Sequence, residues 1–192
     1  MEETDNMEET GDMEETDNTR RPAVICVSGL KNSGKTALIE ALIPLLAEHG
    51  ISTAVIKHHG HGFGDKIPDK PGTDTYRFLA SGARGIVIYD DGTLVLVKHQ
   101  AMGPEGLIAL FPEADLVIIE GGKAEPYPRI AMLRTGQTPA EITIGDAPLL
   151  CAVTDPDYDM AALPAGLARF DFGDFRPVSD FLLDCIQRPR GV

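Results

Sequence analysis

The sequence predicts an α/β fold in which a doubly wound, mostly parallel β-sheet carries an inserted β-hairpin. Three observations support this prediction. A glycine-bounded loop stands between a strand-like apolar run and a helix-forming run within residues 23–48. A second buried-strand pattern follows that helix, and a strand–helix–strand unit implies parallel pairing with a right-handed crossover. Further apolar runs then alternate with helical patterns as far as residue 187.

The glycine-bounded loop, residues 29–36, reads Gly-Leu-Lys-Asn-Ser-Gly-Lys-Thr and matches the phosphate-binding pattern G-x-x-x-x-G-K-[ST]. The run 23–28 before it predicts a buried strand, and the run 37–43 after it predicts a helix. Such a loop directs backbone N–H groups and the helix dipole toward an anion. The sequence therefore predicts a P-loop NTPase domain that binds a nucleoside triphosphate.

Two side chains of this loop have distinct expected roles. Lys35 is expected to reach the β- and γ-phosphate oxygens as a point charge and to act in catalysis. The Thr36 hydroxyl is placed to hold Mg²⁺. The remaining phosphate contacts are expected from Gly29, Lys31, Asn32, Ser33, Gly34 and Ala37.

The first helix is expected to end near Glu48, because Gly50 can adopt the left-handed conformation that often follows a helix. Residues 53–57 predict a second buried strand. The loop 58–72 follows its carboxyl end and is rich in His, Gly, Asp and Pro. Open α/β folds bind ligands at this end of their strands, so the loop is predicted to border the ligand site.

A helix and a β-hairpin are predicted next. The helix begins with Thr73 or Asp74 as its N-cap. Its expected buried positions are Tyr76, Phe78, Leu79 and Ala83. Residues 85–89 and 93–97 predict two strands joined by a turn of Asp and Gly residues. An antiparallel insertion of this kind offers an edge for a homodimer.

The remaining chain continues the alternation of strands and helices. Strands are predicted at 115–122, 129–134, 149–153 and 168–172. Short helices are predicted at 105–111 and 177–187. Residues 22–192 are therefore expected to form one nucleotide-binding domain with a single core.

Chemistry on a Mg²⁺-bound nucleotide needs a second acidic group near the metal, commonly at the end of a neighbouring strand. Glu120 is the predicted residue, because an apolar strand precedes it and Gly121 and Gly122 allow backbone to approach the phosphates. Asp115 would lie at the opposite end of the sheet. A solvated loop carboxylate is the alternative role for Glu120. Lys123 is a candidate phosphate or substrate contact, with an ordinary surface lysine as the alternative.

The histidine-rich loop leaves two interpretations open. His58, His59 and His61 with Asp65 and Asp69 could form a metal site. Their spacing is loose and no cysteine joins them, which favours contacts with an anion or a substrate.

Base recognition has no clear motif, because the chain lacks the Asn-Lys-x-Asp pattern that reads guanine. Asp155, after the strand 149–153, is the candidate carboxylate for a guanine edge. Asp74 and Arg77 are one helical turn apart, so an ion pair between them is the simplest expectation.

The charge of the chain is uneven. Residues 1–18 repeat a six-residue unit as MEETDN, MEETGD and MEETDN, and contain nine of the 30 acidic residues and no Lys or Arg. The remainder carries 21 acidic against 17 basic residues. Residues 1–21 are therefore predicted to be a disordered acidic tail. The mildly acidic remainder argues against a nucleic-acid partner.

Targeting signals are not found. The first residues are acidic rather than apolar, and no apolar run reaches the roughly 18 residues of a membrane span. Cys26, Cys151 and Cys185 lie far apart in apolar segments and are expected to be reduced core residues. These features predict a cytoplasmic protein without membrane contact.

Four segments, taken in order, resemble the MobB family of molybdopterin-guanine dinucleotide biosynthesis proteins B. They are residues 29–36, the strand end Ile56-Lys57-His58 with its histidine loop, residues 69–76, and Ile118-Ile119-Glu120-Gly121 with Lys123. The resemblance covers roughly residues 23–155, and the Pro-Gly-x-Asp-[Ser/Thr] pattern within it is the most specific part. The loop after His58 is longer than the family pattern, and the acidic tail lies outside it.

The resemblance implies a homodimeric, Mg²⁺-dependent GTP-binding protein with weak GTPase activity. Such a protein assists the guanylyltransferase that joins GMP to molybdopterin, and molybdopterin is a further implied ligand. By position, Asp69 and Asp74 would line the nucleotide or cofactor cleft, and Glu120 would serve Mg²⁺ or water. Two alternatives stay open: a P-loop small-molecule kinase, which would need arginines from a mobile lid, and a metallochaperone GTPase using the histidine loop.

Overall fold

The computed structural model describes four ranges of the chain: 21–58, 70–98, 100–142 and 144–187. The predicted acidic tail, apart from Arg21, lies outside them. The same is true of His59, His61, Asp65 and Asp69, so the predictions for these residues concern positions outside the described structure. Within the described ranges, no helix is both long and apolar enough to cross a bilayer.

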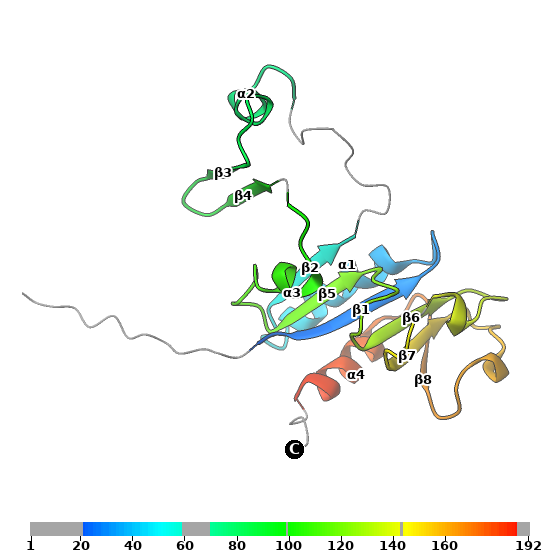
Figure 1. Cartoon of the computed structure of the whole chain (residues 1–192). Coiled ribbons are helices and arrows are strands. Elements are labelled where there is room, and N and C mark those ends of the chain that lie inside the picture. The colour runs from blue at the N-terminus through cyan, green and yellow to red at the C-terminus, as the bar shows by residue number, and fades with distance from the viewer. Residues whose placement is uncertain (1–20, 59–69, 99, 143, 188–192) are drawn as a thin grey trace, which may run out of the picture.

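Six parallel strands form the central sheet in the order β2-β5-β1-β6-β7-β8 (Figure 1). They are β1 (Ala23–Gly29), β2 (Thr53–Lys57), β5 (Leu116–Glu120), β6 (Arg129–Leu133), β7 (Leu149–Thr154) and β8 (Ala168–Asp171). The interior strands are short apolar runs rich in β-branched residues, as expected for strands buried on both faces. The predicted α/β fold with a parallel sheet is confirmed, and the strands lie close to their predicted bounds.

One face of the sheet is covered by α1 (Lys35–Ala47) and α4 (Arg176–Gln187). Alternate strand residues point to this face, because successive side chains of a strand lie on opposite sides. The largest core cluster forms here and includes Val27, Leu38, Ile118, Met132 and Leu182. Gly50, with a φ of +74°, follows the end of α1 as predicted. This packing fixes the N-terminus of α1 beside the carboxyl ends of the central strands.

The opposite face is covered by shorter segments. The helix α3 (Pro104–Ile108) packs on one side, with Val117 and Ile119 beneath it. A separate core cluster on this face includes Leu133, Ile142 and Tyr158. The 3₁₀ turns η1 (Pro139–Glu141) and η2 (Met160–Ala162) lie in the chain segments that contribute Ile142 and Tyr158 to it. Helical segments therefore cover both faces of the sheet.

The cysteines differ in their surroundings. Cys26 and Cys151 are buried, and burial raises the pKa of their thiols to about 11 and about 12 respectively. Cys185 is exposed, so the prediction that it is a core residue was wrong. The apolar side of α4 is supplied instead by Val178, Leu182 and Leu183.

A smaller unit consists of α2 (Asp74–Ala80), β3 (Gly85–Tyr89) and β4 (Leu94–Lys98). The two strands pair with each other in antiparallel fashion, and in Figure 1 the unit lies away from the six-stranded sheet. The Thr73 hydroxyl caps α2 by accepting a hydrogen bond of 3.2 Å from the Tyr76 N–H.

Burial in α2 differs from its prediction. Leu79 is buried and Tyr76 is half-buried, but Phe78 is 59% exposed and Ala83 is also exposed. Within the described ranges this short helix packs mainly against β3, which covers only one of its sides.

Candidate functional site

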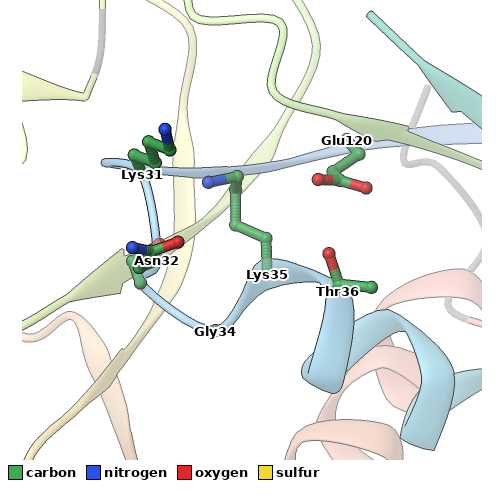
Figure 2. Close-up of a pocket in the computed structure, with 7 residues that line it drawn as sticks. Lys31, Asn32, Gly34, Lys35, Thr36 and Glu120 are labelled. Carbon is green, nitrogen blue, oxygen red and sulfur yellow. The ribbon is translucent and has the colours of Figure 1, made fainter. Parts of the chain in front are cut away.

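A pocket of about 380 Å³ lies at the carboxyl end of β1, where the chain turns into α1. Its lining consists of Lys31, Asn32, Ser33, Gly34, Lys35, Thr36 and Glu120 (Figure 2). Six of these residues come from the predicted phosphate loop and the seventh from the end of β5. Parallel pairing places the ends of β1 and β5 side by side, with Val27 opposite Glu120. The sheet therefore joins two predicted parts of the site that are far apart in the sequence.

The two glycines of the motif are required by their surroundings. Gly34 has a φ of +95°, and a Cβ there would lie 2.9 Å from the Phe172 ring carbon Cζ. A Cβ at Gly29 would lie 2.8 Å from the Met132 carbonyl oxygen. Both distances are too short for real contacts. Only glycine allows the loop to take its path between α1 and the neighbouring strands.

The Lys35 ammonium points back along the loop. It donates hydrogen bonds to the carbonyl oxygens of Gly29 at 3.2 Å and Leu30 at 2.8 Å. Partial burial lowers its pKa, an effect opposed by Glu120 and reinforced by Lys123 and Lys57. Anionic oxygens in the pocket would therefore meet an ammonium that the protein solvates incompletely.

The carboxylate of Glu120 lies on the same side of the pocket as the Thr36 hydroxyl (Figure 2). Only 13% of its side chain is exposed, and one oxygen is 3.1 Å from the Lys57 ammonium. A hydroxyl and a carboxylate are the hard oxygen ligands that Mg²⁺ prefers. These two residues therefore fit the predicted metal position.

The turn after Glu120 contains the predicted contacts Gly121 and Lys123. Gly121 and Gly122 have positive φ angles of 96° and 60°. The Lys123 ammonium donates a hydrogen bond of 2.8 Å to the Glu141 carbonyl oxygen. Lys123 therefore contributes positive charge near the site, while its direct partner in this structure is the η1 turn.

Three other predicted contacts lie outside the pocket lining. Ala37 follows Thr36 in the first turn of α1 and is exposed. His58 is exposed directly after β2. Asp74 lies on α2, where its carboxylate pairs with Arg77 at 3.5 Å and is 80% exposed. The structure thus does not bring Asp74 to the phosphate loop, because α2 belongs to the hairpin unit.

Asp155 follows β7 on the other side of the phosphate loop from Glu120. Its carboxylate accepts hydrogen bonds from the Arg134 guanidinium at 2.5 Å and from the Thr135 N–H at 3.1 Å. The Thr135 N–H, followed by Arg134, holds the pKa of Asp155 below its usual value. Arg134 also stacks on Phe172, with 3.6 Å between the guanidinium carbon and the ring centroid. The predicted base contact is thus part of a cluster that supports the phosphate loop at Gly34.

Several neighbours of the site were not predicted. Lys57 ends β2 beside Glu120, Arg129 lies below the turn after Glu120, and Arg134 and Phe172 contact the loop from behind. Each stands at an end of a predicted strand, which is the only signal that the sequence offers. Within the described ranges, no group of three His, Cys, Asp or Glu residues could hold a metal ion by itself.

Comparisons with known proteins show the family of this chain. The model of the MobB family, molybdopterin guanine dinucleotide synthesis protein B, matches residues 24–155. A molybdopterin-guanine dinucleotide biosynthesis adapter protein of Haemophilus influenzae is 32% identical over 170 residues, which are 86% of this chain and 90% of the relative. The Escherichia coli adapter protein is 28% identical over 88% of this chain and 95% of its own length. A probable adapter protein of Bacillus subtilis is 38% identical over 57% of this chain, and the match spans 64% of that relative.

Solved structures share the fold of this chain. The crystal structure of Bacillus subtilis MobB has a TM-score of 0.68 and 29% identity, covering 88% of this chain and 99% of that one. A MobB homolog from Bacillus stearothermophilus has a TM-score of 0.64 at 21% identity, covering 86% of this chain and 99% of that one, which shows a shared fold.

Proposed function

The chain belongs to the MobB family, and from this premise we propose that it is a GTP-binding adapter in molybdopterin guanine dinucleotide biosynthesis. It would assist the guanylyltransferase that joins GMP to molybdopterin. The observation that carries the proposal is the pocket between the phosphate loop and Glu120. The names of the relatives from E. coli and H. influenzae, both adapter proteins of this biosynthesis, support it.

Phosphate binding follows from the loop and the helix behind it. The N-terminus of α1 presents unpaired backbone N–H groups and the positive end of its dipole to the pocket. Lys35 would exchange its bonds to the carbonyls of Gly29 and Leu30 for bonds to the β- and γ-phosphates. Lys31 and Asn32 line the open side and would contact the same phosphates.

Thr36 and Glu120 would hold Mg²⁺ through their oxygens. The bound ion would neutralise negative charge on the phosphates. One oxygen of Glu120 pairs with the Lys57 ammonium. When Glu120 binds the metal or orients a water, its carboxylate must therefore either break the ion pair with Lys57 or bind the ammonium and the metal at the same time.

Hydrolysis of GTP is proposed to be slow and dependent on Mg²⁺. Fast phosphoryl transfer generally uses an arginine that stabilises charge in the transition state. Within the described structure, the charged residues lining the pocket are Lys31, Lys35 and Glu120, and no arginine is among them. Binding without rapid turnover suits an adapter better than an enzyme.

The base and the second ligand are assigned by position. Asp155 is proposed to face the guanine edge, because it follows the second strand beyond β1 on the side opposite Glu120. A carboxylate has about four lone-pair positions, so its bonds to Arg134 and Thr135 leave it able to accept another donor. Molybdopterin is the further proposed ligand, and His58, exposed at the end of β2, is its described candidate contact.

The protein is also proposed to be a cytoplasmic homodimer. One face of the β3–β4 hairpin exposes two paired sets of apolar side chains, namely Val87 with Leu96 and Tyr89 with Leu94. All four are at least 45% exposed. A second copy would cover this apolar face.

The test is a comparison of GTP and ATP binding in Mg²⁺, followed by hydrolysis with and without molybdopterin and the partner guanylyltransferase. We expect preferential GTP binding, slow hydrolysis and stimulated formation of the dinucleotide. Lys35→Ala should abolish nucleotide binding while the protein stays folded. Rapid phosphate transfer to a small acceptor would identify a kinase, and stoichiometric Zn²⁺ or Ni²⁺ binding lost on changing His58, His59 and His61 would identify a metallochaperone. Either result would contradict the proposal.

A further inference from the structure

Arg129 is a buried cation that forms no ion pair with any carboxylate of the described ranges. It begins β6, has no exposed surface and is the largest fully buried side chain of the described structure. No carboxylate of the described ranges lies within ion-pair distance of it. Burying a charge is costly unless hydrogen bonds compensate for the lost water. The bonds that Arg129 makes therefore indicate what it does.

Those bonds converge on the turn that follows Glu120. The guanidinium donates to the carbonyl oxygens of Gly122 at 3.4 Å, Lys123 at 3.2 Å and Glu125 at 2.6 Å. It also donates to the Ser28 hydroxyl at 3.2 Å. The remaining nitrogen, Nε, has no hydrogen-bond partner among the described residues. Every bond of this side chain thus goes to residues 120–125, here called the Glu120 turn, or to Ser28.

The connection between β5 and β6 explains why an arginine stands here. Residues 121–128 cross from one strand to the other without forming a helix. The carbonyl oxygens of Gly122 and Lys123 each accept one backbone N–H, from Glu125 and Ile144, in a turn that is mostly half-buried. Arg129 supplies a second donor to each of these two oxygens, because a carbonyl oxygen has two lone pairs. A planar guanidinium can donate to several acceptors at fixed angles, which a lysine ammonium does less well.

Ser28 links this arginine to the pocket. Its hydroxyl accepts from Arg129 and donates a hydrogen bond of 2.8 Å to the carbonyl oxygen of Gly121, the residue after Glu120. The Gly121 N–H is bonded to the Val27 carbonyl oxygen at 2.9 Å. The main chain next to the Glu120 carboxylate is thus held by two hydrogen bonds to β1, through Val27 and Ser28, and Arg129 of β6 binds the second of these residues.

We propose that Arg129 is a positioning residue, which acts through Ser28 and the Glu120 turn to place the Glu120 carboxylate opposite Thr36. This inference rests on the proposed function, because it concerns the same Mg²⁺-nucleotide site. It adds a residue that touches neither nucleotide nor metal. Loss of its bonds would let the turn move, so that Glu120 would no longer be presented to the metal, while the phosphate loop itself would be unchanged.

The test compares nucleotide affinity with Mg²⁺ and with EDTA in the full-length protein. Arg129→Lys should reduce the affinity gain from Mg²⁺ by about fivefold or more, and Ser28→Ala by a smaller factor, whereas affinity in EDTA should stay near the wild-type value. Arg169→Lys is the matched control. Arg169 also bonds across two strands, through the Thr154 hydroxyl at 2.8 Å, but lies away from Glu120. It should lower thermal stability without changing the ratio of the two affinities.

A second measurement needs no nucleotide. Hydrogen exchange at the amides of Gly121 and Glu125 should accelerate in Arg129→Lys and Ser28→Ala and remain unchanged in Arg169→Lys. If Arg129→Lys does not fold, Ser28→Ala alone carries both measurements. Variants that lose stability but keep the wild-type affinity ratio and exchange rates would overturn the inference. A wild-type protein that binds nucleotide equally well in Mg²⁺ and EDTA would contradict the metal role of Glu120 in the proposed function, and the inference with it.

Discussion

Lys57 lies opposite Glu120 in the parallel pairing of β2 with β5, and its ammonium nitrogen is 3.1 Å from a carboxylate oxygen. The carboxylate that is proposed to serve Mg²⁺ is therefore paired with a cation of the protein. The lysine side chain is 60% exposed, whereas that of Glu120 is 13% exposed. Because the lysine end of the pair is exposed, water can solvate the ammonium when an incoming metal ion displaces it.

Removal of this ammonium tests the relationship. Lys57→Met should lower the Mg²⁺ concentration for half-maximal nucleotide binding by about two- to fivefold, because Glu120 no longer has a competing cation. Titration of Mg²⁺ with a fluorescent nucleotide measures this midpoint. Lys98→Met, on the distant β4 strand, is the control and should leave it unchanged. A midpoint that rises in Lys57→Met would show that the lysine assists metal binding instead.

The close approach of Phe172 to Gly34 predicts an unequal effect of two glycine substitutions. Gly34→Ala should abolish most nucleotide binding and lower the free energy of unfolding by more than about 2 kcal/mol, because strain at a φ of +95° adds to overlap with the ring. Gly50→Ala meets open space and should cost only about 1–2 kcal/mol from strain, with binding intact. Urea denaturation and nucleotide titration measure both effects. Equal losses in the two variants would contradict the role of Phe172.

The lowered pKa of Asp155 makes its contribution to stability depend on pH. The carboxylate stabilises the fold above the ordinary Asp pKa of about 4, and this contribution is lost as the pH falls through the lower pKa of the folded state. Asp155→Asn should therefore lower the urea midpoint at pH 7, and its difference from the wild type should shrink below about pH 4. Asp184→Asn, exposed on α4, is the control and should change neither. A constant difference at all pH values would exclude the charge as its cause.

The apolar hairpin face predicts the basis of a dimer. Val87→Glu combined with Leu96→Glu places two carboxylates opposite each other on that face, and desolvating them would oppose association. Light scattering after gel filtration should show a shift from dimer to monomer, with nucleotide binding retained. Asp91→Lys, in the hairpin turn, changes charge without altering the apolar face and should leave the dimer intact. A double variant that stays dimeric would place the interface elsewhere.

Much of this architecture could be predicted because its signals are local. The strands follow from apolar runs, and the phosphate loop follows from a motif whose glycines and lysine are close in the chain. Glu120 was predicted from its place at a strand end, and the parallel sheet brings it to the pocket. Asp74 was expected at the same cleft, but the chain carries it away with the hairpin unit. Sequence order alone does not show whether an insertion folds back onto the sheet.

The sequence by itself determined the phosphate loop, because its left-handed glycine, its backbone donors and its helix N-terminus are properties of one short segment. Only the tertiary structure decided which side chains surround that segment. Lys57 meets Glu120 because β2 lies beside β5, and Phe172 meets Gly34 because the chain after β8 reaches the start of α1. Arg129 meets the Glu120 turn because β5 and β6 flank β1. These contacts depend on strand order, which is set by the packing of the whole sheet and not by any local pattern.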